Sequence, residues 1–382
     1  MTNQKFSTIC LIYFISLFCF VVVRIASSLG AFSFMPSDIA DLIFTIIIQL
    51  MVMGIIPFVL YITVYKKEKI TKQSIKTALS DIGFKKISLK SIICSVLLGI
   101  CVYVFNIIIA SFFDLILSLL GYAGTGGSGS TNSKEWYLFF SLFITAVMPG
   151  IFEEILHRGI LLKGVKENTN IKCAIILSGV LFGLMHLNIN QFFYAAIIGM
   201  FFTIMAILTK SIWVPIILHF MNNAINVYLS WANASGSFGS DFYEILNNFL
   251  QNNNIVFVMI CAVSIILVLT ILAVYLVIAL YNENNKENKI YLRLLTPNHM
   301  KNYLKAKKND ILNQENQNQT INYSKCVSRE NDVIPAEQSL PDLFNINNTK
   351  SEKISFKYSI FLYATLILGG LTTLFTYIWG IL

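Results

Sequence analysis

Four polar side chains that together could hydrolyse an amide bond lie in three separate apolar segments of the chain. Glu153 lies in the first of these segments, His186 at the end of the second, and His219 with Asn223 in the third. A glutamate beside a histidine can hold a water molecule and take its proton as a general base. A second histidine and an asparagine can donate hydrogen bonds to the oxyanion that forms when a carbonyl is attacked. These four residues are the predicted catalytic set.

The same residue types permit a second chemistry. Glu153, His186 and His219 supply one carboxylate and two imidazoles, all of which are zinc ligands, and a bound zinc ion would then activate the water. The sequence leaves activation by glutamate and histidine alone and activation by zinc both open, and it signals no other cofactor. The sequence contains no HExxH pattern, so a metalloprotease of the site-2 type is not indicated.

Three further residues around Glu153 are predicted to support the site. Glu154 and Arg158 are four residues apart, so they share a helix face and can form an ion pair with the acid on the N-terminal side. Glu153 is displaced from Glu154 by ~100° around the helix and can therefore face other helices. His157 follows Glu153 by four residues and could pair with that carboxylate.

The remaining polar or aromatic positions of the spans have simpler interpretations. Phe182 precedes His186 by one helical turn and is expected to pack against it and position it. Arg24, Asp41 and Asp114 occur singly and near the ends of apolar segments, where snorkelling or packing accounts for them.

The helices that must position these side chains are predicted to lie in a membrane. The chain has 382 residues, of which 56% are hydrophobic and only 13% are charged, whereas soluble domains carry about 25% charged residues. This composition excludes a secreted domain and a disordered scaffold. The net charge of +8 does not indicate a nucleic-acid partner, because the basic residues separate apolar runs, where membrane topology explains them.

Nine ranges have the length and apolar character of membrane-spanning helices. They are 7–28, 41–65, 91–120, 136–162, 173–187, 191–209, 212–231, 254–281 and 358–381. The predicted fold is an all-α polytopic transmembrane helix bundle of about eight core spans plus one C-terminal accessory span. The predicted domains are a membrane-embedded core at 1–281 with its motif block at 136–231, a polar and largely disordered cytoplasmic linker at 282–357, and the accessory helix at 358–382.

The distribution of lysines predicts the orientation of the bundle. Segment 66–90 contains eight lysines, and the later loops on the same side carry Lys163, Lys166, Lys172 and Lys210. Because an excess of Lys and Arg marks cytoplasmic loops, the N-terminus is expected inside. The Asn-, Ile- and Lys-rich composition favours the cytoplasmic membrane of a prokaryote.

Three motifs follow one another on successive predicted helices and resemble a known family. They are EExxxR (Glu153, Glu154, Arg158), FxxxH (Phe182, His186) and HxxxN (His219, Asn223). This order resembles the CAAX protease and bacteriocin-processing family, also called the abortive-infection family of intramembrane endopeptidases, which is related to the Ras-converting-enzyme type of CAAX protease. The resemblance covers roughly 136–231.

The resemblance implies a role for each motif residue and a site open toward the cytoplasm. It implies that Glu153 is the water-activating base with His186 assisting, that His219 and Asn223 stabilise the oxyanion, and that Glu154 and Arg158 support the site. The residue before the motif arginine is commonly apolar or aromatic in this family and is His157 here.

We therefore expect an intramembrane endopeptidase that hydrolyses a peptide bond in a membrane-associated protein or peptide. Its expected partners are the lipid bilayer and that substrate, without nucleic acid, and the sequence leaves the oligomeric state open. The alternative is a non-catalytic membrane immunity or scaffold protein that binds a peptide or a partner membrane protein through the same polar cluster. A transporter would carry internal repeats or broken helices in matching positions, and the sequence has neither.

Overall fold

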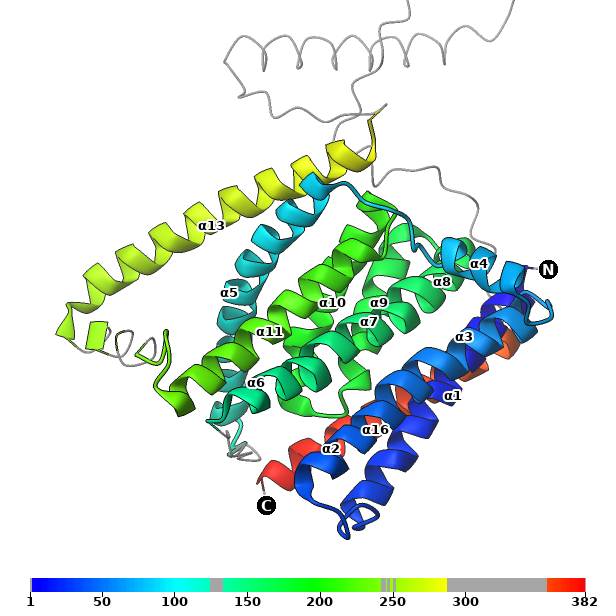
Figure 1. Cartoon of the computed structure of the whole chain (residues 1–382), viewed down its shortest axis with the longest axis horizontal. Coiled ribbons are helices and arrows are strands. Elements are labelled where there is room, and N and C mark those ends of the chain that lie inside the picture. Colours follow the sequence, from blue (N-terminus) through cyan, green and yellow to red (C-terminus); the bar gives the residue numbers. More distant parts are fainter. Residues whose placement is uncertain are drawn as a thin grey trace, which may run out of the picture.

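The computed structural model describes residues 2–123, 133–241, 245, 248–249, 252–286 and 356–381 (Figure 1). These residues form helices and no strand, which confirms the all-α prediction. Apart from 282–286 and 356–357, the predicted linker lies outside the described residues, so the predicted division into core, linker and last helix stays a prediction.

The helices follow the expected spans in chain order, with π-helical segments marked η. They are α1 (Thr2–Ser28), α2 (Ser37–Thr45), η1 (Ile46–Ile55), α3 (Ile56–Leu60), η2 (Tyr61–Tyr65), α4 (Lys72–Asp81), α5 (Leu89–Leu119), α6 (Glu135–Ser141), η3 (Leu142–Val147), α7 (Met148–Glu154), η4 (Ile155–Leu161), α8 (Leu162–Asn168), α9 (Ile171–Met185), α10 (Ile189–Thr209), α11 (Trp213–Ser235), α13 (Ile255–Asn284) and α16 (Phe356–Ile381).

All nine predicted ranges are helical, but within the described residues only seven helices are long and apolar enough to cross a membrane. The helix α9 has 15 residues, fewer than the ~20 that a bilayer crossing needs. The helix α11 has 23 residues but includes His219 and four asparagines, which lower its hydropathy. Both exceptions carry predicted site residues, and the seven apolar helices make the chain a multi-pass membrane protein.

One end of the bundle gathers the lysine-rich loops, and we call it the lysine-rich end. The backbone N–H of Ile212, between α10 and α11, donates to the carbonyl of Gly83, before α5, at 2.9 Å. The amide of Asn285, after α13, donates to the carbonyl of Leu208 near the end of α10, at 2.8 Å. These contacts bring together loops that lie far apart in the sequence.

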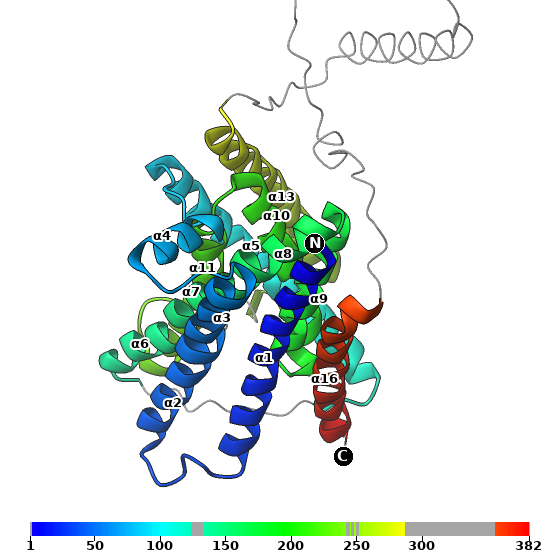
Figure 2. The same ribbon diagram turned by 90° about the vertical axis from the view of Figure 1, so that its right-hand side faces the viewer.

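The opposite end is held by contacts among the other loops. The indole of Trp231, near the end of α11, donates to the carbonyl of Lys134 before α6 at 3.2 Å. The N–H of Ile189, at the start of α10, donates to the hydroxyl of Thr376 on α16 at 3.0 Å. The loops therefore sort into two ends in the pattern that the lysine distribution predicts, and α16 packs against α1 and α9 (Figure 2).

Glycines let the short helix α9 lie very close to α10. A Cβ atom added at Gly183 would lie 2.6 Å from the carbonyl oxygen of Phe192, and one added at Gly199 would lie 2.9 Å from a ring carbon of Phe182. Since no side chain fits at either position, the two backbones approach as small residues allow in membrane helices. This packing fixes the position of Phe182 and of the helix end that carries His186.

Candidate active site

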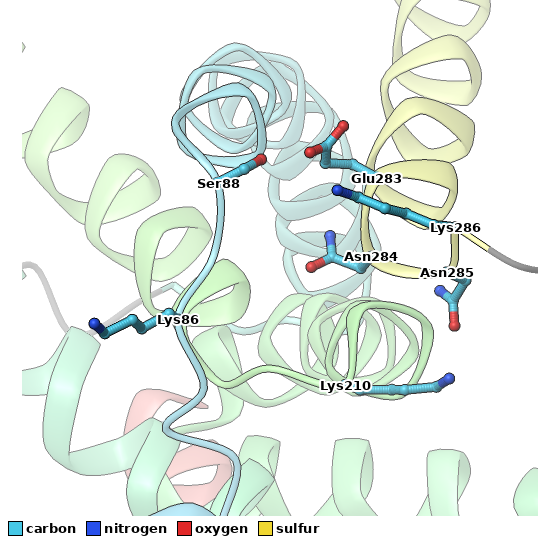
Figure 3. A pocket seen from close by; sticks show the side chains of 7 residues that line it. All are labelled: Lys86, Ser88, Lys210, Glu283, Asn284, Asn285 and Lys286. Carbon is cyan, nitrogen blue, oxygen red and sulfur yellow. The ribbon is translucent and has the colours of Figure 1, made fainter.

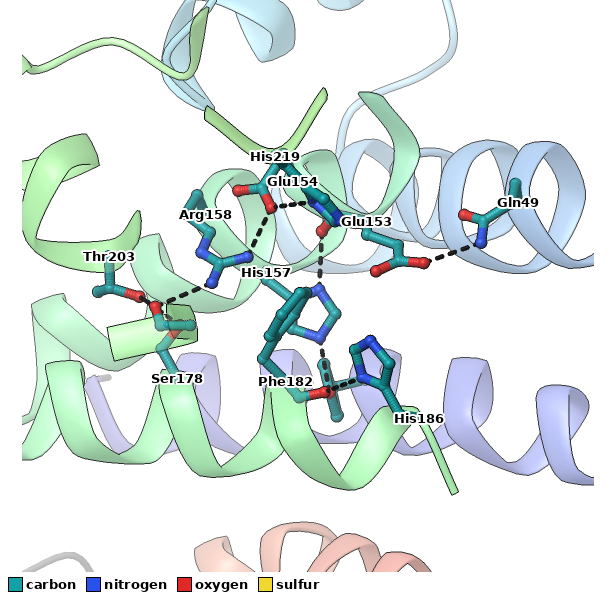
Figure 4. Close-up of polar contacts among 12 residues, drawn as sticks. Gln49, Glu153, Glu154, His157, Arg158, Ser178, Phe182, His186, Thr203 and His219 are labelled. Carbon is teal, nitrogen blue, oxygen red and sulfur yellow. Dashed lines mark hydrogen bonds and ion pairs between the residues drawn. The ribbon is translucent and has the colours of Figure 1, made fainter. Parts of the chain in front are cut away.

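Glu153, the predicted base, receives a hydrogen bond from a helix that the motifs do not include. The Gln49 amide Nε2 donates to the Glu153 Oε1 at 2.8 Å (Figure 4). Gln49 lies in η1, and both side chains are buried, with Glu153 8% exposed. Sequence reasoning missed Gln49, although an isolated amide in the apolar range 41–65 was a signal that could have found it.

Glu154 faces in a different direction and forms a buried ionic cluster. Its Oε1 accepts a hydrogen bond from Arg158 Nη1 at 2.7 Å and another from His219 Nδ1 at 2.9 Å. The side chains of Glu154 and Arg158 are both fully buried. Arg158 Nη2 also donates to the carbonyl of Gly199 on α10 at 2.8 Å. The ion pair that the four-residue spacing predicted is thus present, as a buried charge requires. Its further contacts with His219 on α11 and with the Gly199 carbonyl on α10 connect three helices.

Both ring nitrogens of His157 are used in packing the helices. Nδ1 lies 2.7 Å from the backbone carbonyl of Glu153, and Nε2 lies 2.9 Å from the hydroxyl of Tyr13 on α1. The hydroxyl of Tyr13 also contacts the carbonyl of Leu181 at 2.9 Å. His157 therefore contacts the backbone of Glu153 and, through Tyr13, connects to α1 and α9. Neither ring nitrogen forms a hydrogen bond with the carboxylate of Glu153, the partner that the sequence suggested.

Phe182 lies at the centre of the cluster. Its ring centroid is 4.9 Å from that of His157, 5.1 Å from that of His186 and 5.7 Å from that of His219. The guanidinium carbon of Arg158 lies 4.4 Å from the same centroid, in the range of a cation–π contact. The packing role that the sequence predicted for Phe182 extends to three histidines and the arginine.

The hydrogen bonds of the two histidines determine which nitrogen atoms remain available. His186 Nδ1 lies 2.9 Å from the carbonyl of Phe182, and since a carbonyl only accepts, this nitrogen carries the hydrogen in the neutral ring. His219 Nδ1 donates in the same way to the carboxylate of Glu154. In both rings Nε2 is the nitrogen left for a substrate or a water molecule.

Asn223 belongs to a series of carboxamides from two helices. Asn106 on α5 donates to Asn222 at 3.0 Å, and Asn222 donates to the Oδ1 of Asn223 at 3.1 Å. The Nδ2 of Asn223 then donates to the carbonyl of Thr145 at 3.0 Å. An amide nitrogen has two hydrogens, so Asn223 keeps one for a further acceptor. Sequence reasoning named Asn223 and missed Asn106 and Asn222.

A cavity of about 610 Å³ joins part of the predicted set. The predicted residues on its wall are Glu153, Phe182, His186, His219 and Asn223. The supporting residues Glu154, His157 and Arg158 lie behind this wall. Asp114, which is exposed near the end of α5, also borders the cavity; its interpretation as a snorkelling or packing position stays a prediction.

The zinc alternative does not fit the arrangement of the side chains. Among the described residues, no three His, Cys, Asp or Glu side chains are grouped so that they could hold a metal ion. His186 and His219 each keep Nε2, and Glu153 keeps Oε2, so the disagreement lies in the spacing of these groups and not in their chemistry. Glu153, His186 and His219 thus form no prepared ligand set.

Comparison with known proteins gives two matches, one to a family and one to a single protein. Residues 135–225 match the family described as "Type II CAAX prenyl endopeptidase Rce1-like". A Bacillus subtilis (strain 168) protein named "Putative membrane peptidase YdiL" is 32% identical over 88 residues, which are 23% of this chain and 36% of that protein. The chain therefore matches about a third of the length of this relative. No solved structure matches the chain.

Proposed function

We propose, from the premise that residues 135–225 form a segment of the CAAX protease family, that the chain is an intramembrane endopeptidase. The observation that carries this proposal is a cavity bordered by the carboxylate of Glu153 and two imidazoles, each with an atom left for a reactant. Gln49 occupies Oε1 of Glu153, which leaves Oε2, while His186 and His219 each keep Nε2.

The first chemical step is attack of a water molecule on the carbonyl carbon. The Oε2 of Glu153 and the neutral Nε2 of His186 both accept hydrogen bonds. A water molecule between them donates one hydrogen to each and directs a lone pair away from both, toward a bound peptide carbonyl. As the carbon–oxygen bond forms, Glu153 takes one proton from the water, as a general base does.

The second step requires donors for the oxyanion and a proton for the leaving group. The free hydrogen of Asn223 Nδ2 supplies one hydrogen bond. When both ring nitrogens carry hydrogen, the Nε2 of His219 donates the other, since its Nδ1 hydrogen already points at Glu154. The proton on Glu153 then passes to the departing nitrogen, and the carbon–nitrogen bond breaks.

The substrate in this proposal is a peptide or a membrane-associated protein. The lysine distribution supports a location in the cytoplasmic membrane of a prokaryote with the N-terminus inside. The competing hypothesis is a non-catalytic immunity or scaffold protein that binds a peptide through the same cavity.

Replacement of Glu153 by Gln in the full-length chain tests the proposal. Peptide termini in membranes from cells that produce the wild-type chain are compared by mass spectrometry with those from cells that produce Glu153→Gln at the same level. We expect the termini that depend on the wild-type chain to disappear with this variant. Glu135→Gln, in the first turn of α6 and exposed, is the matched control and should retain them.

Two results would contradict the proposal. Wild-type-dependent termini that persist with Glu153→Gln and also with Glu153→Ala would exclude Glu153 as the base. A chain that generates no termini, but still binds a peptide or partner protein with Gln at this position, would favour the immunity or scaffold function.

A further inference from the structure

The cavity of the proposed active site is closed on one side and exposed on the other. Its floor includes His219, which is 5% exposed, and Phe202, which is 1% exposed. Its rim includes Asp114, Thr145 and Asn226, whose side chains are exposed. The cavity therefore opens past these three residues, which come from α5, η3 and α11.

The rim lies toward the end of the bundle opposite to the lysine-rich end. The helix α5 starts at Leu89 at the lysine-rich end, and Asp114 lies near its other end, Leu119. The first turn of α10 contributes Asn190 and Gln191 to the cavity. This turn begins with Ile189, whose N–H donates to the hydroxyl of Thr376 at the opposite end.

Apolar side chains close the cavity toward the lysine-rich end. Phe202 packs there in one buried cluster with Leu98, Met205, Val214 and Leu218. The last four are fully buried. Beside this cluster, the buried ion pair of Glu154 and Arg158 fills the space behind the site. A peptide that approached from the lysine-rich end would have to displace both.

The cavities at the lysine-rich end are separate from the site. One, of about 390 Å³, is lined by Lys85, Lys163, Lys166 and Lys210 among others and reaches only the back of the site, at Arg158. Another, of about 470 Å³, is lined by Lys86, Lys210, Lys286 and neighbouring polar residues (Figure 3). Neither cavity is bordered by Glu153, His186 or His219.

We infer that substrates reach the active site from the non-cytoplasmic side of the membrane. The inference rests on the proposed function and on the rule that lysine-rich loops face the cytoplasm. The substrate class is then a polypeptide that presents its scissile bond on the outer side, such as an exported peptide or the outer juxtamembrane segment of a membrane protein. The rim residues Asp114 and Asn226, with Asn190 and Gln191 on the cavity wall, supply the hydrogen-bonding groups that an extended peptide backbone requires. The family resemblance implied the other direction, a site open to the cytoplasm.

Cysteine accessibility tests the direction directly and needs no substrate. All seven native cysteines are replaced in the full-length chain, and Asp114→Cys or Asn226→Cys is introduced singly at the rim. A membrane-impermeant maleimide is then added to intact cells and to lysed cells. Lys210→Cys is the matched control for the lysine-rich end.

We expect both rim cysteines to react in intact cells and Lys210→Cys to react only after lysis. Rim cysteines that react only after lysis, or not at all, would overturn the inference. Reaction of Lys210→Cys in intact cells would reverse the orientation and would overturn it as well. Labelling does not depend on hydrolysis, so adding Glu153→Gln to the rim variants should leave the pattern unchanged. A failure of the access direction is therefore distinguishable from a failure of the proposed chemistry.

Discussion

Glu153 and Glu154 are adjacent in the sequence, and the two regions that they face differ in almost every physical respect. Glu153 receives a hydrogen bond from the neutral amide of Gln49 and borders the cavity. Glu154 is fully buried behind the cavity wall, where Arg158 and His219 both donate to one of its oxygens. A step of ~100° around the helix separates the two carboxylates.

This difference explains how one short motif can supply both a reactant and its support. A carboxylate that has one neutral partner and a free oxygen beside a cavity can take a proton from water. A carboxylate that is fully buried with an arginine is closed to the cavity, and its contacts hold three helices together. We therefore expect substitutions at Glu153 to affect catalysis and substitutions at Glu154 to affect stability.

The largest expected effect is on the catalytic rate of Glu153→Gln. Loss of a general base lowers rates by roughly 10²- to 10⁴-fold, whereas the neutral isostere keeps the packing beside Gln49. The rate of product formation and the apparent melting temperature in detergent are measured on the same preparation. A melting temperature that falls as far as that of Glu154→Gln would remove the contrast between the two glutamates.

Glu154→Gln is expected to have the largest effect on stability. The change leaves the guanidinium of Arg158 buried without its carboxylate, and breaking a buried pair in this way costs about 3–5 kcal/mol. Thermal unfolding in detergent measures the loss. In the double variant Glu154→Gln with Arg158→Met both charges are absent, so part of the stability should return; a double variant less stable than either single variant would argue against a mainly electrostatic role.

The variant Asn223→Ala tests whether Asn223 donates a hydrogen bond to the oxyanion. Removal of one oxyanion donor typically lowers kcat by about 10²- to 10³-fold, and the Michaelis constant should change little because the hydrogen bond forms in the transition state. Asn222→Ala is the matched variant, since the Asn222 amide donates to Asn223, and its effect on kcat should be smaller. Equal losses in the two variants would indicate that the whole carboxamide series acts as one unit.

The smallest expected effect is that of Gln49→Leu. This change removes the hydrogen bond to Glu153, and a net loss of about 1.4 kcal/mol, within the range for a typical intramolecular hydrogen bond, corresponds to a roughly tenfold lower kcat. Gln73→Leu on the exposed surface of α4 is the control and should have no effect. If Gln49→Leu is as active as the wild-type chain, Gln49 has only a packing role.

Features that depend on residues close together in the chain could be predicted from the sequence. The spacing of Glu154 and Arg158 predicted their ion pair because an α-helix repeats every 3.6 residues, and the pair is present at 2.7 Å. Apolar length predicted where the helices run, and alternating lysine content predicted how the loops sort between the two ends. The three motifs predicted which helices would supply the polar cluster. Each of these properties is local, so no knowledge of packing was needed.

Only the tertiary structure decided which distant residues complete the site and which way the cavity opens. Gln49 lies 104 positions before Glu153, Tyr13 lies 144 positions before His157, and Asn106 lies 116 positions before Asn222. No periodicity connects positions so far apart, because helices in a bundle meet through the shapes of their packed faces and through close approaches such as that of α9 and α10. The direction of the cavity likewise follows from which end of these helices carries large apolar side chains in contact, and that contact exists only in the folded bundle.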